Sequence, residues 1–326
     1  TVSYVLNNNT SVTIPEETRR RIWSAVEQLG YTPHTQAQAL RSGKTRTITM
    51  LYPWDDTCTQ IELEFLTGAA RAATEEDFFF NLITAPLAEE GLLNLYRGKQ
   101  TDGVILMQIR LHDWRVDLLR ENHYPFVVIG SCEDNTGLSF VDIEYDRAIF
   151  EAFKHLVELG HRNIGFLTFP ESWRKSGNTA PVQCMRAHEQ ARQAFNITTA
   201  VREVPLSVEG MYEGFTEILN ELPHVTGLVT SYSATLGGAY RAAFDHGRKI
   251  PDDLSVVGIV GEANASMMIP ALTGFDSQNF ERGYRAAKIL LKSLQSDHFV
   301  PEQVFLPFEL AIRETTSRPP QGFVGA

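Results

Sequence analysis

From Arg46 onward, short apolar runs alternate along the chain with longer segments in which apolar residues recur every three or four positions. Short runs bounded by Gly, Pro and Asn predict buried β-strands, and the longer periodic segments predict amphipathic helices. The predicted strands are Thr47–Tyr52, Phe78–Thr84, Gly103–Gln108, Phe126–Gly130, Asn163–Thr168, Gly227–Thr230 and Leu254–Val260. The predicted helices are Ile61–Glu76, Trp114–Asn122, Ala148–Leu159, Gln183–Phe195, Tyr212–Leu222, Thr235–His246 and Phe280–Leu294.

This alternation of strands and helices predicts an α/β fold with parallel sheets whose two faces are covered. The chain has 326 residues and contains too many strand–helix units for one small sheet. We therefore expect two consecutive lobes, divided near residue 150. No run of about 18 apolar residues occurs, so the sequence predicts no transmembrane helix.

The first 30 residues follow a different pattern and predict two helices joined by a turn. Val2, Val5 and Leu6 lie at helical spacing, and the polar stretch "NNNTS" then interrupts the pattern. A second helix is expected in "TIPEETRRRIWSAVEQLG", where acidic residues in the first turn suit the helix dipole and the final Gly suits a C-cap.

The charge distribution separates this N-terminal region from the remainder. The whole chain carries a net charge of −11, yet residues 1–46 contain six basic and three acidic side chains, a net charge of +3. A basic segment on an acidic body suggests that only this segment meets a polyanion. The three cysteines, Cys58, Cys132 and Cys184, are far apart and odd in number, which favours a reducing, cytoplasmic location.

Several stretches, in order, resemble the LacI/GalR family of bacterial transcription regulators: "TVSYVLN", "IPEETRRRIWSAVEQLGYTP", "AQALRSGKTRTI", "FKHLVELGHRNIGFL", "IPDDLSVVGI", "PALTGF" and "LPFELAIRET". The resemblance implies a two-lobed periplasmic-binding-protein-like core with parallel sheets and three crossovers, preceded by a partial all-α helix-turn-helix head and a hinge helix. The implied domains are a head over 1–30, a hinge over 31–45 and an effector-binding core over 46–326. Within the core, the N-lobe is expected at about 46–148 and 276–298, and the C-lobe at about 149–275 and 299–326.

The resemblance also implies the residues that contact DNA. The chain begins inside the stretch that matches the recognition helix, which would place Thr1, Ser3, Tyr4 and Asn7 at or near base edges. In the hinge helix, Leu40 matches a leucine that wedges into the minor groove, Ala37 matches its small neighbour, and His34 matches a backbone-contacting position. The alternatives are that Tyr4 and Asn7 only cap a short surface helix, and that residues 34–45 form a flexible linker.

The family's effector site is a cleft between the lobes, and the implied contacts are Trp54, Asp55, Tyr145, Arg147, Arg186, Tyr232 and Ser277. Arg186 matches an arginine of the family and is the principal expected contact, with a solvated helix charge as the alternative. Trp54 suits stacking on a sugar face or, alternatively, a packed loop. The resemblance implies that the effector is a sugar or sugar derivative. Several polar positions usual in the family are replaced, as at Val260–Gly261, so the usual pattern of contacts to sugar hydroxyls is not intact. An unusual sugar, a sugar acid or a ligand outside the carbohydrates remains an alternative.

The functional expectation is a ligand-responsive, sequence-specific DNA-binding regulator, acting as a repressor. It implies a homodimer on palindromic operator DNA, with no cofactor and no membrane partner. The alternative is a solute-binding protein of the same core fold that serves transport. The sequence has no G-x-S-x-G, H-E-x-x-H or P-loop motif, and His155 and His161 have no partner cluster, so neither an enzyme nor a metal site is expected.

Overall fold

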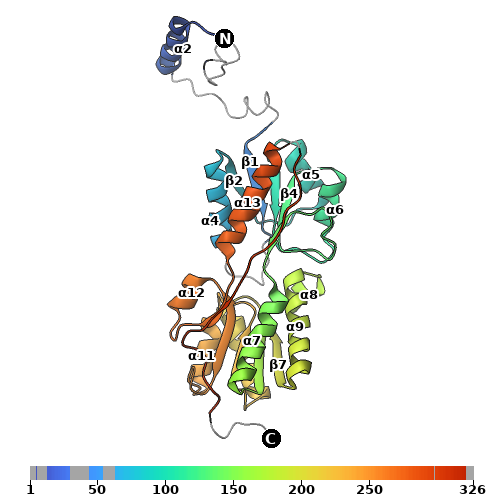
Figure 1. The fold of residues 1–326 in the computed structure, drawn as a ribbon, viewed down its shortest axis with the longest axis vertical. Helices are drawn as coiled ribbons and strands as arrows, with labels where there is room; N and C mark the ends of the chain where they lie inside the picture. The colour runs from blue at the N-terminus through green and yellow to red at the C-terminus, as the bar shows by residue number, and fades with distance from the viewer. Residues whose placement is uncertain (1–4, 6–12, 30–43, 54–62, 297, 321–326) are drawn as a thin grey trace. The chain divides into compact units, whose positions relative to one another are not determined.

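The computed structural model describes residues 5, 13–29, 44–53, 63–296 and 298–320 (Figure 1). It comprises two compact units, residues 1–46 and 47–326. In the first unit, helix α2 (Glu16–Leu29) confirms the second predicted helix of the head, with Glu16 and Glu17 in its first turn. Negative side chains there interact favourably with the positive end of the helix dipole.

The N-lobe of the second unit is built on a six-stranded sheet in the order β11-β5-β4-β3-β1-β2. All of its strand pairs are parallel. Its strands are β1 (Thr47–Leu51), β2 (Phe79–Ile83), β3 (Gly103–Leu106), β4 (Phe126–Ile129), β5 (Phe140–Asp142) and β11 (Gln303–Phe305).

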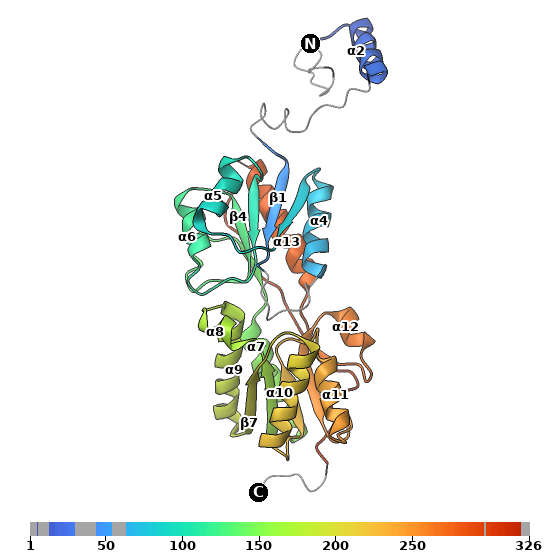
Figure 2. The ribbon, with the colours of Figure 1, turned by 180° about the vertical axis from the view of Figure 1, so that it is seen from behind.

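Helices cover both faces of this sheet, as Figures 1 and 2 show from opposite sides. Side chains alternate along each strand, so Ile48 and Met50 pack into one core with α4 (Leu63–Glu75) and α13 (Asn279–Gln295). Leu51 packs into a second core, beneath α5 (Glu89–Arg97) and α6 (Trp114–Glu121). The helices α4 and α13 approach closely: a Cβ on Gly68 would lie 2.1 Å from the Phe280 carbonyl oxygen.

The C-lobe repeats the plan with a sheet in the order β12-β10-β9-β8-β6-β7, parallel except for the β10–β12 pair. Its strands are β6 (Asn163–Thr168), β7 (Thr198–Glu203), β8 (Gly227–Thr230), β9 (Ser255–Val260), β10 (Thr273–Asp276) and β12 (Leu310–Ala311). Its helices are α7 (Tyr145–Leu159), α8 (Glu171–Lys175), α9 (Thr179–Phe195), α10 (Val208–Glu221), α11 (Gly237–Asp245) and α12 (Glu262–Met267).

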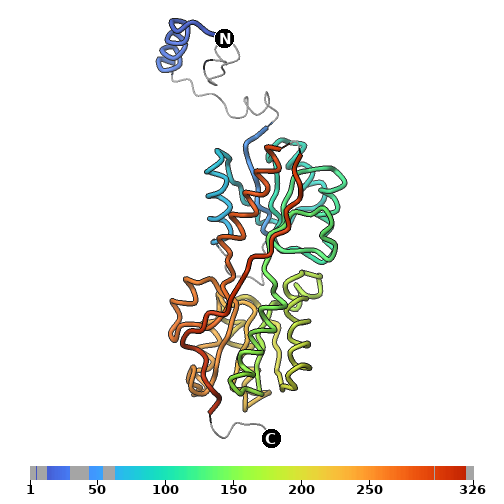
Figure 3. The backbone as a smooth tube through the Cα atoms, in the orientation of Figure 1, coloured from blue at the N-terminus to red at the C-terminus, as the bar shows by residue number. Residues whose placement is uncertain are grey.

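The chain passes between the lobes in three segments, which Figure 3 traces: β5 to α7, β10 to α13, and β11 to β12. The first two passages lie near the expected positions. The third lies later than expected, because β11 still pairs in register with β5 of the N-lobe, with Gln303 opposite Phe140. Residues 303–305 therefore belong to the N-lobe sheet and not to the C-lobe.

Candidate functional site

A cavity of about 110 Å³ lies between the two lobes, where the carboxyl ends of both sheets meet. Tyr52 and Met107, which follow β1 and β3, line it from the N-lobe. Phe169 and Tyr232, which follow β6 and β8, line it from the C-lobe. Each pair flanks the point where the strand order of its sheet reverses, and ligands of parallel α/β sheets bind in that crevice.

A buried ion pair forms the charged part of the cavity wall. Arg282 of α13 donates to Asp142 at the end of β5, over 3.2 Å, and both side chains are almost fully buried. The other carboxylate oxygen of Asp142 accepts a hydrogen bond from Ser131, and the backbone N–H of Ile143 donates to the first. Burial raises the pKa of the Asp142 carboxyl above its ordinary value, and the positive charge of Arg282 opposes that rise.

Aromatic rings hold the Arg282 guanidinium in place. It lies 5.0 Å from the centre of the Phe65 ring and 5.7 Å from that of Tyr145, within the range of cation–π attraction. It also donates a long hydrogen bond of 3.4 Å to the Tyr145 hydroxyl. Because Tyr145 opens the C-lobe helix α7, this arginine connects both lobes at the base of the cavity.

The C-lobe contributes aromatic faces and hydroxyl groups to the cavity. Phe169 and Trp173 are stacked with ring centres 6.0 Å apart, and both line the cavity. Ser277 lies in the second interlobe passage and is 6% exposed, and within the described residues its Oγ makes no hydrogen bond. A buried hydroxyl without a partner is costly, so a ligand group that bonds to Ser277 would gain that interaction.

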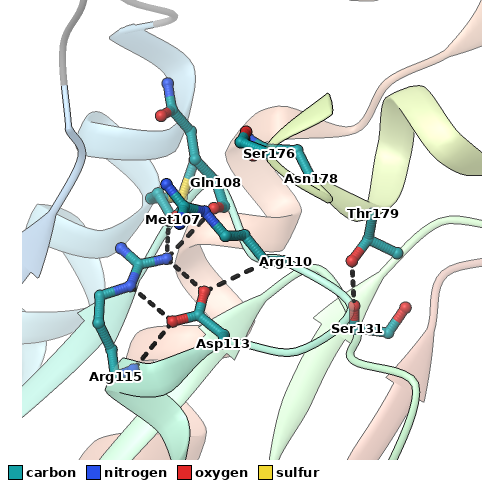
Figure 4. Close-up of polar contacts among 9 residues, drawn as sticks. All are labelled: Met107, Gln108, Arg110, Asp113, Arg115, Ser131, Ser176, Asn178 and Thr179. Carbon is teal, nitrogen blue, oxygen red and sulfur yellow. Dashed lines mark hydrogen bonds and ion pairs between the residues drawn. The ribbon is translucent and has the colours of Figure 1, made fainter. Parts of the chain in front are cut away.

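The two lobes also touch directly beside the cavity. Arg110 and Asn178 form an antiparallel β-bridge, in which the Leu111 N–H donates to Gly177 and the Thr179 N–H donates to Ile109. The Thr179 hydroxyl donates over 2.7 Å to the carbonyl oxygen of Ser131, as Figure 4 shows. These bonds join the loops after β3 and β4 to the start of α9, so the lobes are held together along this edge.

A second contact between the lobes lies at Glu64 of α4. Its carboxylate faces Gly261, where a Cβ would lie 3.0 Å from both carboxylate oxygens. Burial raises the pKa of Glu64, the nearby charge of Asp276 raises it further, and a hydrogen bond from Asn279 lowers it. The Glu64 carboxylate of the N-lobe therefore occupies the space beside Gly261 that a side chain at position 261 would need.

Of the described residues that the sequence predicts for the effector site, Tyr145, Tyr232 and Ser277 line the cavity. Arg147 and Arg186 do not line it. Arg186 is exposed on α9 and forms an ion pair of 2.9 Å with Asp146, while Arg147 lies over the Phe308 ring at 5.4 Å. The remaining predicted positions lie outside the described residues: Thr1, Ser3, Tyr4, Asn7, His34, Ala37, Leu40, Trp54 and Asp55.

The buried ion pair of the wall, Asp142 and Arg282, is not among the residues predicted from the sequence. The three-residue strand that ends at Asp142 is too short to stand out in a hydrophobic pattern. Arg282 lies on the face of α13 that is otherwise buried against the sheet. An arginine within the apolar face of a helix is the signal that would have identified it.

The two histidines singled out in the sequence have ordinary partners. His161 is buried and bonds to the Thr226 hydroxyl and the Ser317 carbonyl, both at 2.9 Å. His155 bonds to the Thr316 hydroxyl at 3.2 Å. In the part of the chain that the structure describes, no cluster of three His, Cys, Asp or Glu residues is arranged to hold a metal ion. The same part contains no helix with the length and apolar character that crossing a membrane requires.

Two family models match the chain. Residues 153–316, half of the chain, match the model described as periplasmic binding protein-like domain. Residues 1–34 match the model of bacterial regulatory proteins of the lacI family.

Individual relatives extend over nearly the whole chain. Catabolite control protein A of Priestia megaterium is 27% identical over 97% of this chain and 95% of its own length. The transcriptional regulator AglR of Rhizobium meliloti is 29% identical over 98% and 91%. The HTH-type transcriptional repressor PurR of Klebsiella pneumoniae is 27% identical over 89% of this chain and 85% of its own length.

Solved structures share the fold. The transcriptional regulator CelR in complex with cellobiose has a TM-score of 0.72 at 23% identity, covering 97% of this chain and 95% of its own. A regulator of Enterococcus faecium with bound ribose has a TM-score of 0.71 at 23% identity, covering 83% and 99%.

Proposed function

Because the chain belongs to the LacI family of bacterial regulatory proteins and has a periplasmic-binding-protein-like core, we propose that it represses transcription as a cytoplasmic homodimer on palindromic DNA. As a member of this family, the chain is a ligand-responsive, DNA-binding transcriptional regulator. The match over residues 1–34 is to a regulator model, so a role as a transport solute-binding protein is not favoured. The relatives are transcriptional regulators and not enzymes.

The effector is a sugar or sugar derivative that binds in the interlobe cavity. The wall of the cavity combines stacked aromatic rings with hydroxyls and a charged pair, which suits the apolar faces and hydroxyl groups of a sugar. Ser277 carries this proposal, because its buried Oγ faces a cavity and lacks a partner within the described residues. The relatives whose structures contain cellobiose and ribose support the same ligand class.

The proposed contacts are Tyr145, Tyr232 and Ser277, joined by Asp142 and Arg282. Arg282 takes the place that the sequence assigned to Arg186, since Arg282 lines the cavity and Arg186 does not. The predicted contacts at Trp54 and Asp55 and those to DNA at Thr1, Ser3, Tyr4, Asn7, His34, Ala37 and Leu40 remain part of the proposal. They rest on the family match of the head and on the sequence.

Ligand binding would act on DNA affinity through the relative position of the lobes. A sugar that bonds to Ser277 and to the Arg282–Asp142 pair touches both lobes and favours one closure state over others. Any difference in closure alters the geometry presented to the hinge segment and, through it, the operator. Coupling of this kind is typically worth a 5- to 150-fold change in affinity.

The test is calorimetry of the chain with a panel of monosaccharides, disaccharides and sugar acids, followed by DNA binding. We expect saturable binding of at least one sugar. Duplexes selected from a random pool should contain a palindrome, and the sugar should change their affinity at least about fivefold. If no carbohydrate binds but the chain selects a palindrome, the sugar proposal is wrong and the regulator stands. Selection of no common sequence would contradict the operator proposal.

A further inference from the structure

A second pocket lies beside the interlobe cavity and continues it. Its volume is about 150 Å³, against about 110 Å³ for the first. Three residues line both: Gln108, Trp173 and Asn178. The two spaces are therefore adjacent parts of one cleft, and the second is no smaller than the first.

The second pocket occupies the N-lobe crevice at which the strand order reverses. Leu51 and Pro53 reach it from the end of β1, Gln108 and Arg110 from the end of β3, and Ala85–Leu87 from the end of β2. Parallel α/β sheets bind their ligands at this position. Trp173 and Asn178 close the pocket from the C-lobe, so anything bound there also touches both lobes.

The residues of this pocket are those that recognise a sugar ring. The half-buried rings of Trp114 and Trp173 offer apolar faces, and Gln108 and Asn178 offer side-chain amides. Arg110 is exposed, and among the described residues its guanidinium forms no ion pair or hydrogen bond. Its forked donors suit two adjacent hydroxyl groups.

Hydrogen bonds of Asp113 and Arg115 brace the loop that carries Gln108 and Arg110, as Figure 4 shows. Asp113 accepts hydrogen bonds from the Arg110 backbone N–H and from the Arg115 backbone N–H and guanidinium. Arg115 in turn donates to the carbonyl oxygens of Met107 and Gln108. Gln108, whose carbonyl oxygen is part of this brace, has a φ of +52°, a left-handed conformation that is uncommon for a residue with a Cβ.

This bracing fixes the backbone of the loop at Gln108 and Arg110 before a ligand arrives. A loop that is ordered in advance reduces the ordering cost of binding. The network consumes Asp113 and most donors of Arg115, but leaves the side chains of Gln108 and Arg110 for a ligand.

We propose that the effector is a carbohydrate of at least two linked rings, with one ring in the interlobe cavity and the next in the pocket formed by Gln108, Arg110, Trp114 and Trp173. This inference rests on the proposed function and narrows its ligand class from a sugar to a disaccharide or longer. The second ring contributes affinity and lies against the β-bridge that joins the lobes.

The experiment is isothermal titration calorimetry of the full chain with glucose, galactose, maltose, cellobiose, lactose and trehalose. We expect one disaccharide to bind at least about tenfold more tightly than its component monosaccharide. R110A and W114A should each weaken that disaccharide about tenfold while leaving the affinity for the monosaccharide within about twofold. R97A, at an exposed arginine of the same lobe that lines neither pocket, is the matched control.

The possible outcomes separate this inference from the proposed function. A monosaccharide that binds as tightly as every disaccharide would overturn the two-ring proposal and leave a sugar-responsive regulator. Equal losses for both ligands in R110A would also overturn it, since the pocket would then affect only lobe closure. Failure of every sugar to bind contradicts both proposals. R110A alters an exposed side chain, so its melting temperature should match that of the unaltered chain.

Discussion

The two lobes have the same strand order and the same pair of helical layers, yet they place their polar groups differently. The N-lobe carries the buried ion pair of Asp142 and Arg282 at the cavity wall. The C-lobe meets the cavity with aromatic rings and hydroxyls, and one of its buried ionisable groups, His188, is not among the residues that line the cavity. One architecture thus supports a charged ligand wall in one lobe and a neutral one in the other.

This difference separates ligand recognition from the stability of each lobe. A charged pair at the cavity is stable only while both partners remain, because either charge alone would be buried without compensation. A histidine in an apolar core is stable only while it is neutral. The N-lobe should therefore be sensitive to loss of a partner, and the C-lobe to acid.

The largest expected effect comes from breaking the N-lobe pair. In R282M, Asp142 keeps its buried charge without its partner, and we expect the free energy of unfolding to fall by about 3 to 5 kcal/mol. Urea denaturation followed by circular dichroism measures it. The control is R285M on the same helix, whose exposed pair with Glu281 should be worth less than about 1 kcal/mol. Similar losses in both variants would show that the burial of the pair is unimportant.

The C-lobe should lose stability in acid through His188. This residue lies 5.4 Å from the Phe166 ring centre and bonds to the Thr199 hydroxyl, and burial lowers its pKa to about 4. Between pH 6.5 and about 4, His188 is protonated in the unfolded chain but remains neutral in the folded chain. The stability contributed by neutral His188 is full above pH 6.5 and falls by about 3 kcal/mol as the pH drops to 4.

The measurement is urea denaturation between pH 4 and 7.5 for the unaltered chain, H188L and a control at the exposed His298, H298Q. Because leucine does not titrate, H188L should lose less stability across this range than the unaltered chain does. H298Q should follow the unaltered chain. Identical slopes for all three proteins would contradict the assignment to His188.

Hydrophobic patterning predicted most of the fold because long strands and helices repeat their pattern several times. All seven predicted strands and all seven predicted helices overlap observed ones. Patterning failed to predict short strands, such as β5 with three residues and β12 with two, because so few residues cannot repeat the alternation of apolar and polar side chains. It also missed β7, whose alternation of Thr, Val and Arg lies at an edge of the sheet with few buried positions.

The site was harder to predict because its members come from distant parts of the chain. Three of the residues implied by the family resemblance, Tyr145, Tyr232 and Ser277, line the cavity, and their contact with an effector remains a prediction. It could not show that Arg186 turns outward to Asp146, since that depends on the rotation of α9. Asp142 and Arg282 are 140 positions apart in the sequence, so a local sequence pattern cannot show that they pair.

Between the lobes, a smaller effect is expected at Ser277. S277A removes a hydroxyl that has no partner within the described residues, so stability should change by less than about 0.5 kcal/mol. Affinity for the sugar should fall about tenfold, the loss of one hydrogen bond. Calorimetry with the best sugar of the panel measures this loss. An unchanged affinity would remove Ser277 from the site.

The smallest effect is expected where the lobes touch at Gly261 and Glu64. Gly261 has a φ of −64°, so alanine fits the backbone without strain. Its new methyl group would lie 3.0 Å from both oxygens of Glu64, which must move by a few tenths of an ångström. The methyl group destabilises only those arrangements of the lobes in which position 261 contacts Glu64. We therefore expect G261A to weaken sugar binding about threefold with little change in stability.

A double-mutant cycle separates this contact from other consequences of the alanine. In E64A the carboxylate is absent, and G261A should then change sugar affinity by less than about 1.5-fold. Such a result would mean that the lobes meet at this contact in the sugar-bound state. If G261A weakens binding equally with and without Glu64, the methyl group acts within the C-lobe alone. The lobes would then be apart at this point when the sugar is bound, and closure would depend on the bridge between Arg110 and Asn178.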